Sequence, residues 1–165
     1  MASFGFDPMD RFSSPISSSA TPLGLGNVYV FPVRALKEKP GRAVMVLSDD
    51  REPFIHDFKN AYSYINTFWK NGNSAGNHYH KRKNEIFTVI HGEVNVYLQS
   101  VEDSTQIEGI YLCAAKENEK TVKRLYIPAG VAHLVFALSS PAILHVVATS
   151  PGTKDDEFEF VVSKK

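Results

Sequence analysis

Cysteine is nearly absent from this sequence, since Cys113 is the only one among 165 residues. A single cysteine excludes an intrachain disulfide and a CxxC redox pair, and it fits a reducing compartment. Charge of one sign is not in excess either, because 18 lysines and arginines balance 18 aspartates and glutamates. Such a balance gives no attraction to a phosphate backbone or an anionic membrane surface. We therefore expect neither nucleic acid nor a membrane as a partner.

Long apolar runs and targeting signals are also lacking. No stretch approaches the roughly 20 apolar residues that cross a bilayer, and the N-terminus has no basic region followed by an apolar segment. The opening segment is rich in serine, but Asp7 and Asp10 differ from the acid-poor composition of transit peptides. The expected location is the cytoplasm.

Residues 1–27 are rich in Ser, Gly and Pro and show no sustained period of either 2 or 3.6. This composition predicts a poorly ordered N-terminal arm, followed by one folded domain at 28–165. With 43% hydrophobic residues the chain can bury one sizeable core, but it is too short for two domains of ordinary size.

From residue 28 onward, short segments dense in β-branched and aromatic residues alternate with turn formers. No segment has the period of a long amphipathic helix. The spacing is typical of an all-β sandwich or barrel. The segments of strand length are NVYVFPV, GRAVMVL, AYSYINTFW, NEIFTVI, GEVNVYLQS, GIYLCAA, RLYIPAG, AHLVFAL, AILHVVA and EFEFVV.

Two histidines stand two residues apart in the segment GNHYHKRKNE. On a strand, residues i and i+2 face the same side, so His78 and His80 project together and form the start of a metal site. After a basic turn, Glu85 opens the next strand, where its carboxylate can return beside the two imidazoles. Phe87 and Val89 share the face of Glu85 and are expected to line the same cavity.

A third imidazole comes from a later segment, LYIPAGVAHLVFAL, in which His133 follows a Pro-Ala-Gly turn. Together these residues form two motifs that resemble those of the cupin family. The first motif is a glycine-led HxH followed by Glu and Gly, and the second is PxG followed by His. They stand here as Gly76, His78, His80, Glu85 and Gly92, and as Pro128, Gly130 and His133.

The resemblance covers roughly residues 28–162 and implies a double-stranded β-helix, the cupin jelly-roll barrel of antiparallel strands. It also implies a divalent metal ion, zinc, iron, manganese or nickel, held by His78, His80, Glu85 and His133. Cupins of this size are often homodimers in which an N-terminal strand crosses to the neighbour, and the segment 27–33 is the candidate for that strand.

Within the cupins, the sequence is most similar to the sugar-nucleotide group. That group contains metal-free deoxysugar ketoisomerases, dehydrorhamnose epimerase-like proteins and the zinc cupin domain of a capsular-polysaccharide enzyme. The ketoisomerases usually have an arginine where this chain has Ala75, whereas the stretch Lys83 to Glu85 and the PxGxxH motif resemble the capsular-polysaccharide enzyme. The resemblance implies an isomerase or epimerase acting on a keto-sugar nucleotide or a similar small carbonyl compound.

Such a reaction removes an acidic C–H proton beside a ketone and stabilises the resulting enolate. An imidazole that titrates near neutral pH suits proton transfer, which makes His78 and His80 candidate catalytic residues. A divalent ion would act as a Lewis acid on the ketone oxygen. Tyr64 or Tyr62 would supply the other acid, and only one of the two is expected to face inward.

Other readings stay open. Three histidines and a glutamate also suit an iron-dependent dioxygenase, and a non-catalytic small-molecule-binding cupin is a third possibility. Glu85 could instead be an exposed strand start that pairs with Lys81 or Lys83 at little energetic gain. His145 interrupts an apolar run and either faces the cavity or, more commonly, is a satisfied core histidine.

Residues that could contact a ring-bearing, phosphorylated ligand are less well defined. The aromatic residues Phe68, Trp69 and Tyr79 could form an apolar wall. The basic residues Arg42, Arg51 and Lys81 could meet a pyrophosphate.

Overall fold

The computed structural model describes residues 21–22, 24–25, 27–32, 34–35, 43–44, 58–59, 61–116 and 121–164. In these ranges the chain is strand and irregular loop, with no α-helix, which confirms the all-β prediction. None of the described segments is a helix long and apolar enough to cross a membrane. Residues 1–20, most of the predicted arm, lie outside the described residues.

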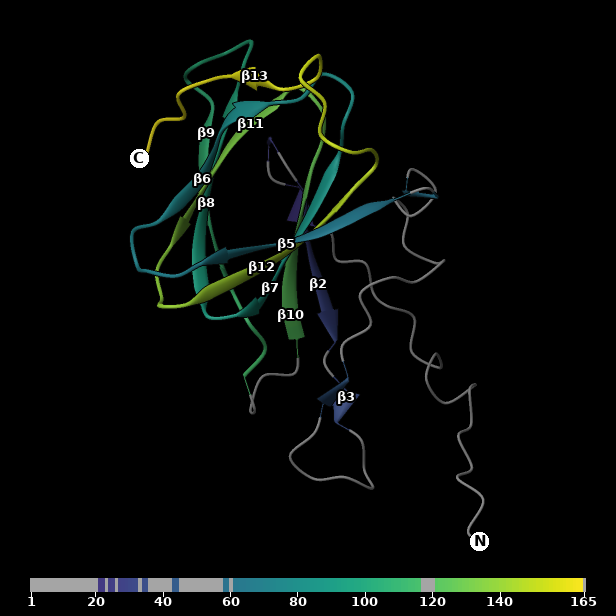
Figure 1. Ribbon diagram of the computed structural model, residues 1–165, viewed down its shortest axis with the longest axis vertical. Coiled ribbons are helices and arrows are strands. Elements are labelled where there is room, and N and C mark those ends of the chain that lie inside the picture. The colour runs from purple at the N-terminus through teal and green to yellow at the C-terminus, as the bar shows by residue number, and fades with distance from the viewer. Residues whose placement is uncertain are drawn as a thin grey trace, which may run out of the picture.

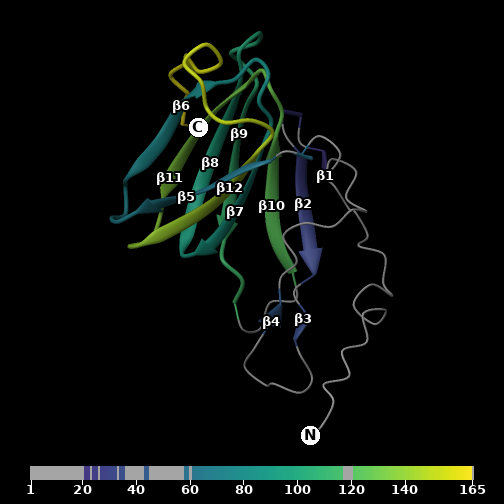
Figure 2. The same cartoon turned by 45° about the vertical axis from the view of Figure 1, so that its right-hand side comes forward.

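Two antiparallel sheets pack against each other. In Figure 2 the strands of the larger sheet lie side by side from β5 to β1, with the smaller sheet beside them. The six-stranded sheet consists, in spatial order, of β1 (Thr21–Pro22), β2 (Asn27–Pro32), β10 (Thr121–Ile127), β7 (Glu85–His91), β12 (Ala142–Ala148) and β5 (Tyr62–Phe68). The five-stranded sheet consists of β13 (Phe158–Glu159), β6 (Ser74–Tyr79), β11 (Val131–Ala137), β8 (Glu93–Ser100) and β9 (Ile107–Cys113). A small separate ribbon pairs β3 (Arg34–Ala35) with β4 (Ala43–Val44) (Figure 1).

Strands that are neighbours in these sheets are mostly distant in sequence. For example, β7 lies between β10 and β12, and β11 lies between β6 and β8. This crossing of the chain between two sheets is the jelly-roll arrangement, which closes the sheets around one core.

The core lies between the two sheets and follows the two-residue period of the strands. On β8, Val94, Val96 and Leu98 are fully buried while the residues between them are less so. On β12, Leu144 and Val146 alternate in the same way. Each strand therefore contributes one apolar face, as expected for a sheet with one face inward.

The strand β11 is buried on both faces, which explains its nearly continuous apolar sequence. Val135 lies in the main core, whereas Ala132 and Leu134 face outward. Val162 and Phe160, from the C-terminal segment, cover that outer face. The C-terminal segment is therefore part of the folded domain and shields the strand that carries His133.

The N-terminal part of the described chain also belongs to the domain. Leu25, within the segment 1–27 that composition assigns to an arm, packs in the main core. The strand β2, predicted to cross to a neighbouring subunit, pairs with β10 of its own chain from Asn27 to Pro32. In this position it satisfies the backbone of β10, which would otherwise be an open sheet edge. The homodimer itself stays a prediction.

The glycine of the HxH motif is required by close backbone packing. Gly76 has a φ of +113°, and a Cβ placed there would lie 2.5 Å from the carbonyl oxygen of His133. At this point the pairing of β6 with β11 shifts register between His133 and Leu134. The missing side chain thus lets the strands that carry His78 and His133 approach each other.

Replacing Gly76 by alanine should destabilise the protein by at least about 2 kcal/mol, because both the backbone angle and the contact with His133 become strained. Urea unfolding measures the change. Gly152→Ala is the matched control, since a Cβ there would have only the Lys83 ammonium at 4.0 Å. Similar losses in the two variants would contradict the argument.

Candidate metal centre

Three histidines from different parts of the sequence meet at one end of the barrel. His78 lies on β6, His80 follows the last residue of that strand, and His133 lies on the adjacent strand β11. One ring nitrogen from each can be chosen so that all three atoms lie within 4.8 Å of one another. The structure therefore brings together the three imidazoles that the two motifs single out.

The carboxylate of Glu85 reaches this cluster from the opposite sheet. Its Oε2 atom lies 3.3 Å from Nε2 of His133 and 3.9 Å from Nε2 of His80. Glu85 is only 2% exposed, so the reading of Glu85 as an exposed strand start is wrong. Phe87, two residues further along β7, is buried with its ring edge-on to His133, as its shared face with Glu85 predicts.

Two polar atoms in the cluster lack hydrogen-bond partners. Oε2 of Glu85 and Nε2 of His80 are both buried and unsatisfied. An unpaired buried polar atom is costly, and here an acceptor oxygen and an imidazole nitrogen face the same cluster. Imidazole nitrogens with one carboxylate oxygen are a donor set that divalent transition metals bind, so these residues fit such an ion.

Backbone carbonyls and a carboxylate lie behind the histidine rings. Nδ1 of His80 donates to the carbonyl oxygen of Asp156 at 2.6 Å, and Nδ1 of His133 faces that of Val131 at 3.4 Å. Nδ1 of His78 lies 3.8 Å from a carboxylate oxygen of Glu157. A hydrogen on Nδ1 leaves the Nε2 lone pair free, which is the tautomer needed for binding a metal through Nε2.

The two motifs are also joined directly through their turns. The amide of Gly130 donates to the carbonyl of His80 at 2.6 Å, and the amide of Ala129 donates to the Asn84 side chain at 2.9 Å. The Asn84 backbone in turn bonds with Thr149. The Pro-Ala-Gly turn therefore fixes the loop between His80 and Glu85, and with it the distance between these two side chains.

Sequence comparison decides the family. Residues 48–151 match the model of the polysaccharide biosynthesis C-terminal domain. The chain belongs to this family. A comparison with curated proteins gives no significant match.

Solved structures similar to this family member are cupins of sugar metabolism. The capsular polysaccharide assembling protein CapF from Staphylococcus aureus is 25% identical over 61% of this chain, with a TM-score of 0.52. The chain spans 27% of the CapF length. The epimerase NovW from Streptomyces spheroides is 19% identical, with a TM-score of 0.66 over 84% of this chain and 71% of its own.

A third similar structure is the 3,4-ketoisomerase QdtA from Thermoanaerobacterium thermosaccharolyticum, at 19% identity and a TM-score of 0.59. It aligns with 79% of this chain and 86% of its own length. At these identities the likeness of NovW and QdtA concerns the fold alone. It confirms the cupin jelly roll that the motifs predict.

A lysine that the sequence analysis named as a possible partner of Glu85 is buried beside the histidine cluster. Lys83 is 5% exposed, and its Nζ atom lies 3.0 Å from Oε1 of Glu85. The sequence allows this pair only as an exposed contact of little energetic value, because the basic KRKN turn suggests solvated charges. Lys83 precedes the first residue of β7, so strand alternation does not predict its burial.

The tyrosines of β5 both lie on the side of this carboxylate. The Tyr64 hydroxyl donates to Oε1 of Glu85 at 3.3 Å. The Tyr62 ring packs against that of Tyr64 and is 46% exposed. The two tyrosines share a face of β5, since they are two residues apart. Of the two, Tyr64 packs against the core and contacts Glu85, in line with the expectation that only one reaches inward.

Burial and nearby charge set the protonation of the cluster. Burial raises the pKa of Glu85, but His133 and Lys83 lower it more, so the pKa lies below its ordinary value. Burial lowers the pKa of His133 to about 4, so His133 is neutral at pH 7 and Lys83 is the cation that balances Glu85. Burial, and then the charge of Glu85, raise the pKa of Tyr64, which keeps its hydroxyl protonated.

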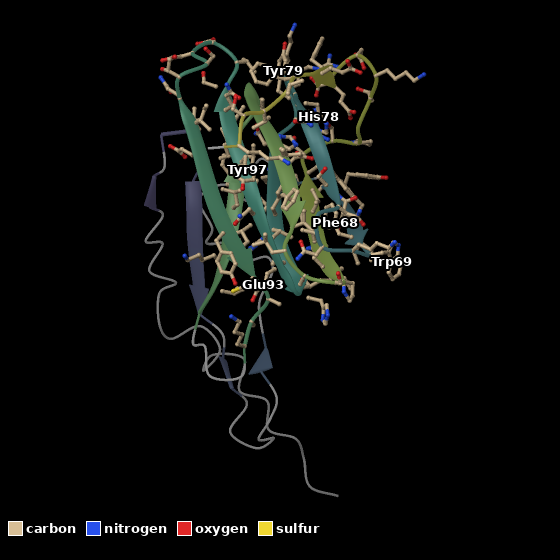
Figure 3. All side chains as sticks on the ribbon, turned by 90° about the vertical axis from the view of Figure 1, so that its left-hand side faces the viewer. Phe68, Trp69, His78, Tyr79, Glu93 and Tyr97 are labelled. Atoms are coloured by element: carbon tan, nitrogen blue, oxygen red, sulfur yellow. The ribbon has the colours of Figure 1, made fainter. Side chains whose placement is uncertain are left out.

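The residues proposed as an apolar wall do not meet. Phe68 is buried in the core, Trp69 is 74% exposed, and Tyr79 stacks on Phe158 on the outer side of β6. Figure 3 shows Trp69 and Tyr79 far apart. Strand alternation explains this result, since Tyr79 lies between His78 and His80 and must face the other way.

Other residues from the sequence analysis lie elsewhere. The Lys81 ammonium packs over the Phe158 ring at 4.2 Å, on the outer face. Arg42 and Arg51 lie outside the described residues. His145 is neither in the cavity nor in the core, because the even face of β12 is buried and His145 points outward, where its Nε2 atom is 2.7 Å from the Ser63 hydroxyl.

Acid should destabilise the metal-free protein through His133. Its pKa is about 4 when folded and 6.5 ordinarily, so between these values the unfolded chain binds a proton that the native state does not. This contribution to stability is complete above pH 6.5 and is lost as the pH falls to 4, by roughly 3 kcal/mol. Urea unfolding across this range should show a flatter pH dependence for His133→Asn, and an unchanged slope would contradict the assignment.

Lys83→Met should destabilise the metal-free protein by about 3–5 kcal/mol, because it leaves the buried Glu85 carboxylate without its cation. Combining it with Glu85→Gln should recover much of the loss, since no buried charge then remains. The exposed Lys81→Met is the control, and thermal or urea unfolding measures all three. If Lys83→Met costs no more than Lys81→Met, the buried pair contributes nothing.

Proposed function

We propose that this chain is a metal-binding cupin that isomerises or epimerises a keto-sugar nucleotide or a similar small carbonyl compound. The observation that carries the proposal is the pair of buried, unsatisfied atoms, Oε2 of Glu85 and Nε2 of His80, within a cluster of three histidines. Neither atom has a hydrogen-bond partner among the described residues, although Nε2 of His133 lies 3.3 Å from Oε2. A divalent cation would satisfy both atoms.

His78, His80, Glu85 and His133 would hold the ion, with zinc, iron, manganese and nickel all compatible with three imidazoles and a carboxylate. When bound, the ion would supply a Lewis acid that polarises a carbonyl oxygen. The His78 side chain is the most exposed of the four, at 22%, so a small molecule would approach from its side.

The proton chemistry would use Tyr64 and the imidazoles. Tyr64 retains its proton and touches Glu85, which places a donor beside the cluster. Burial lowers the pKa of His78, so its ring is neutral near pH 7 and can accept a proton in the metal-free form. His80 would be the alternative acceptor, and Tyr62, at the exposed edge, would border the entrance.

The relatives support the substrate class. NovW is described as a 4-keto-6-deoxy sugar epimerase, and QdtA was solved in complex with TDP-4-keto-6-deoxyglucose. Both reactions move a proton next to a ketone. With the ion bound, a Lewis acid and the protonated Tyr64 would stabilise the enolate, whereas in the metal-free form a neutral imidazole would accept the proton.

Purified protein should contain close to one equivalent of a divalent metal, and the double variant His78→Ala, His133→Ala should lose it. Elemental analysis of both proteins measures this. Incubation with TDP-4-keto-6-deoxyglucose in D₂O should then exchange a C–H proton next to the ketone, detected by NMR, and Tyr64→Phe should slow the exchange by about 10²-fold.

The other outcomes select other functions. Bound iron with oxygen uptake and no proton exchange would indicate a dioxygenase. Ligand binding with neither exchange nor oxygen uptake would indicate a binding protein. Exchange without any metal, even after reconstitution, would overturn the metal-dependent part and leave the isomerase.

A further inference from the structure

The C-terminal segment 153–163 lies beyond the residues that match the family model, which end at 151. In Figure 1 this segment crosses the end of the barrel beside β6 and β11. Its contacts converge on His78, His80 and the turn that follows them. We call residues 153–163 the C-terminal strap.

Asp156 is the centre of these contacts. Its carbonyl accepts the hydrogen bond from Nδ1 of His80. Its buried carboxylate accepts the backbone amides of Lys81 and Arg82 at 3.1 and 3.0 Å. One residue thus holds both the His80 ring and the first two residues of the turn that leads to Glu85.

The neighbouring acidic residues extend this clamp. Asp155 bonds to the Arg82 guanidinium at 2.7 Å on the surface. Glu157 places a carboxylate oxygen 3.8 Å from Nδ1 of His78. Asp156 itself is anchored by its amide, which donates to the carbonyl of Thr153 at 3.0 Å.

The rest of the strap is attached to β6 and to the outer face of the five-stranded sheet. Its short strand β13 pairs with Tyr79 and His78. The amides of Phe160 and Val162 donate to the backbone and side-chain oxygens of Asn77, at 2.8 and 3.1 Å. Asn77 has a positive φ of 62°, a conformation that needs such support in a residue other than glycine. The strap is therefore fixed independently of the Asp156 contacts.

We infer that the C-terminal strap is a positioning element of the metal centre, in which Asp156 fixes the ring orientation and tautomer of His80. The inference rests on the proposed function in that the ring is oriented for a metal. The fold does not depend on the Asp156 carboxylate, because β13 and the Asn77 contacts hold the strap. Metal affinity should depend on it, because loss of the turn frees His80 to rotate away from the other ligands.

The test measures Co²⁺ affinity of the full chain by its visible absorption, in competition with a chelator. Asp156→Ala should weaken binding by about tenfold, while Asp156→Asn, which keeps an acceptor oxygen, should restore most of it. Asp103→Ala is the matched control, because Asp103 also accepts a backbone amide in a turn, that of Thr105 at 3.0 Å. Asp103 lies in the loop between β8 and β9, far from the histidines in sequence.

A second, exposed position keeps the test decisive if Asp156→Ala does not fold. Glu157→Gln should weaken Co²⁺ binding several-fold by removing the carboxylate behind His78, whereas Glu159→Gln, two residues further along the strap, should not. Unchanged affinity in both Asp156→Ala and Glu157→Gln would overturn the inference. So would a loss of thermal stability in Asp156→Ala with unchanged affinity, since that is the result of a purely structural role.

Failure of the proposed metal function remains distinguishable. If the wild-type protein binds no metal, the His80 tautomer in the metal-free protein shows whether Asp156 positions the His80 ring. Imidazole ¹⁵N NMR should show a single Nδ1–H form in the wild type and in Asp156→Asn, and a mixture in Asp156→Ala. A single Nδ1–H form in all three proteins would contradict the positioning role.

Discussion

The buried charge of Glu85 is the constraint on which this structure depends. A carboxylate at 2% exposure is tolerated only if its oxygens find partners. The two oxygens are treated differently, because Lys83 and Tyr64 contact Oε1 while Oε2 faces the imidazoles without a hydrogen bond. One half of the carboxylate is thus neutralised by the protein, and the other half is left available. This division fits the proposed role of Glu85 as a metal ligand better than the role of a purely stabilising ion-pair partner.

The histidines, like Glu85, are positioned by polar groups from other parts of the chain. The rings contact one another, but the polar groups that orient them lie behind them, chiefly the carbonyl of Asp156 for His80 and the carboxylate of Glu157 facing His78. These groups come from the C-terminal strap, while the separation of His80 from Glu85 is set by the Pro-Ala-Gly turn. The strands that carry the histidines, the C-terminal strap and the Pro-Ala-Gly turn therefore meet at the cluster. Each of them positions only some of its residues.

Family membership and fold leave the reaction open, because the jelly roll hosts many chemistries. The match to the polysaccharide biosynthesis C-terminal domain shows the family, and the likeness to NovW and QdtA shows the cupin fold. What carries the proposed reaction is the site itself, with neutral His78 and His133, a protonated Tyr64 and an ionised Glu85. Burial and the contact with Lys83 impose these protonation states.

The sequence by itself determined the class of fold and the members of the cluster. Two-residue alternation and frequent turn formers predict strands, and His78 with His80 share a face because a strand repeats every two residues. Gly76 could be singled out from its motif, although its reason, the approach of the His133 carbonyl, is a contact between distant segments. The same local rule would have placed Tyr62 beside Tyr64. The pairing of Lys83 with Glu85 was among the open readings, but the burial of the pair was not.

Only the tertiary structure decided which polar residues are buried and what supports them. Three findings depend on how the sheets close. They are the separation of Phe68, Trp69 and Tyr79, the outward position of His145 and the pairing of β2 with its own chain. The C-terminal strap carries no motif, and which of its acidic side chains reach the histidines and the turn after them depends on how it crosses β6. Local periodicity fixes which side of a strand a residue faces, whereas the packing of segments distant in sequence decides whether that side is core, metal centre or surface.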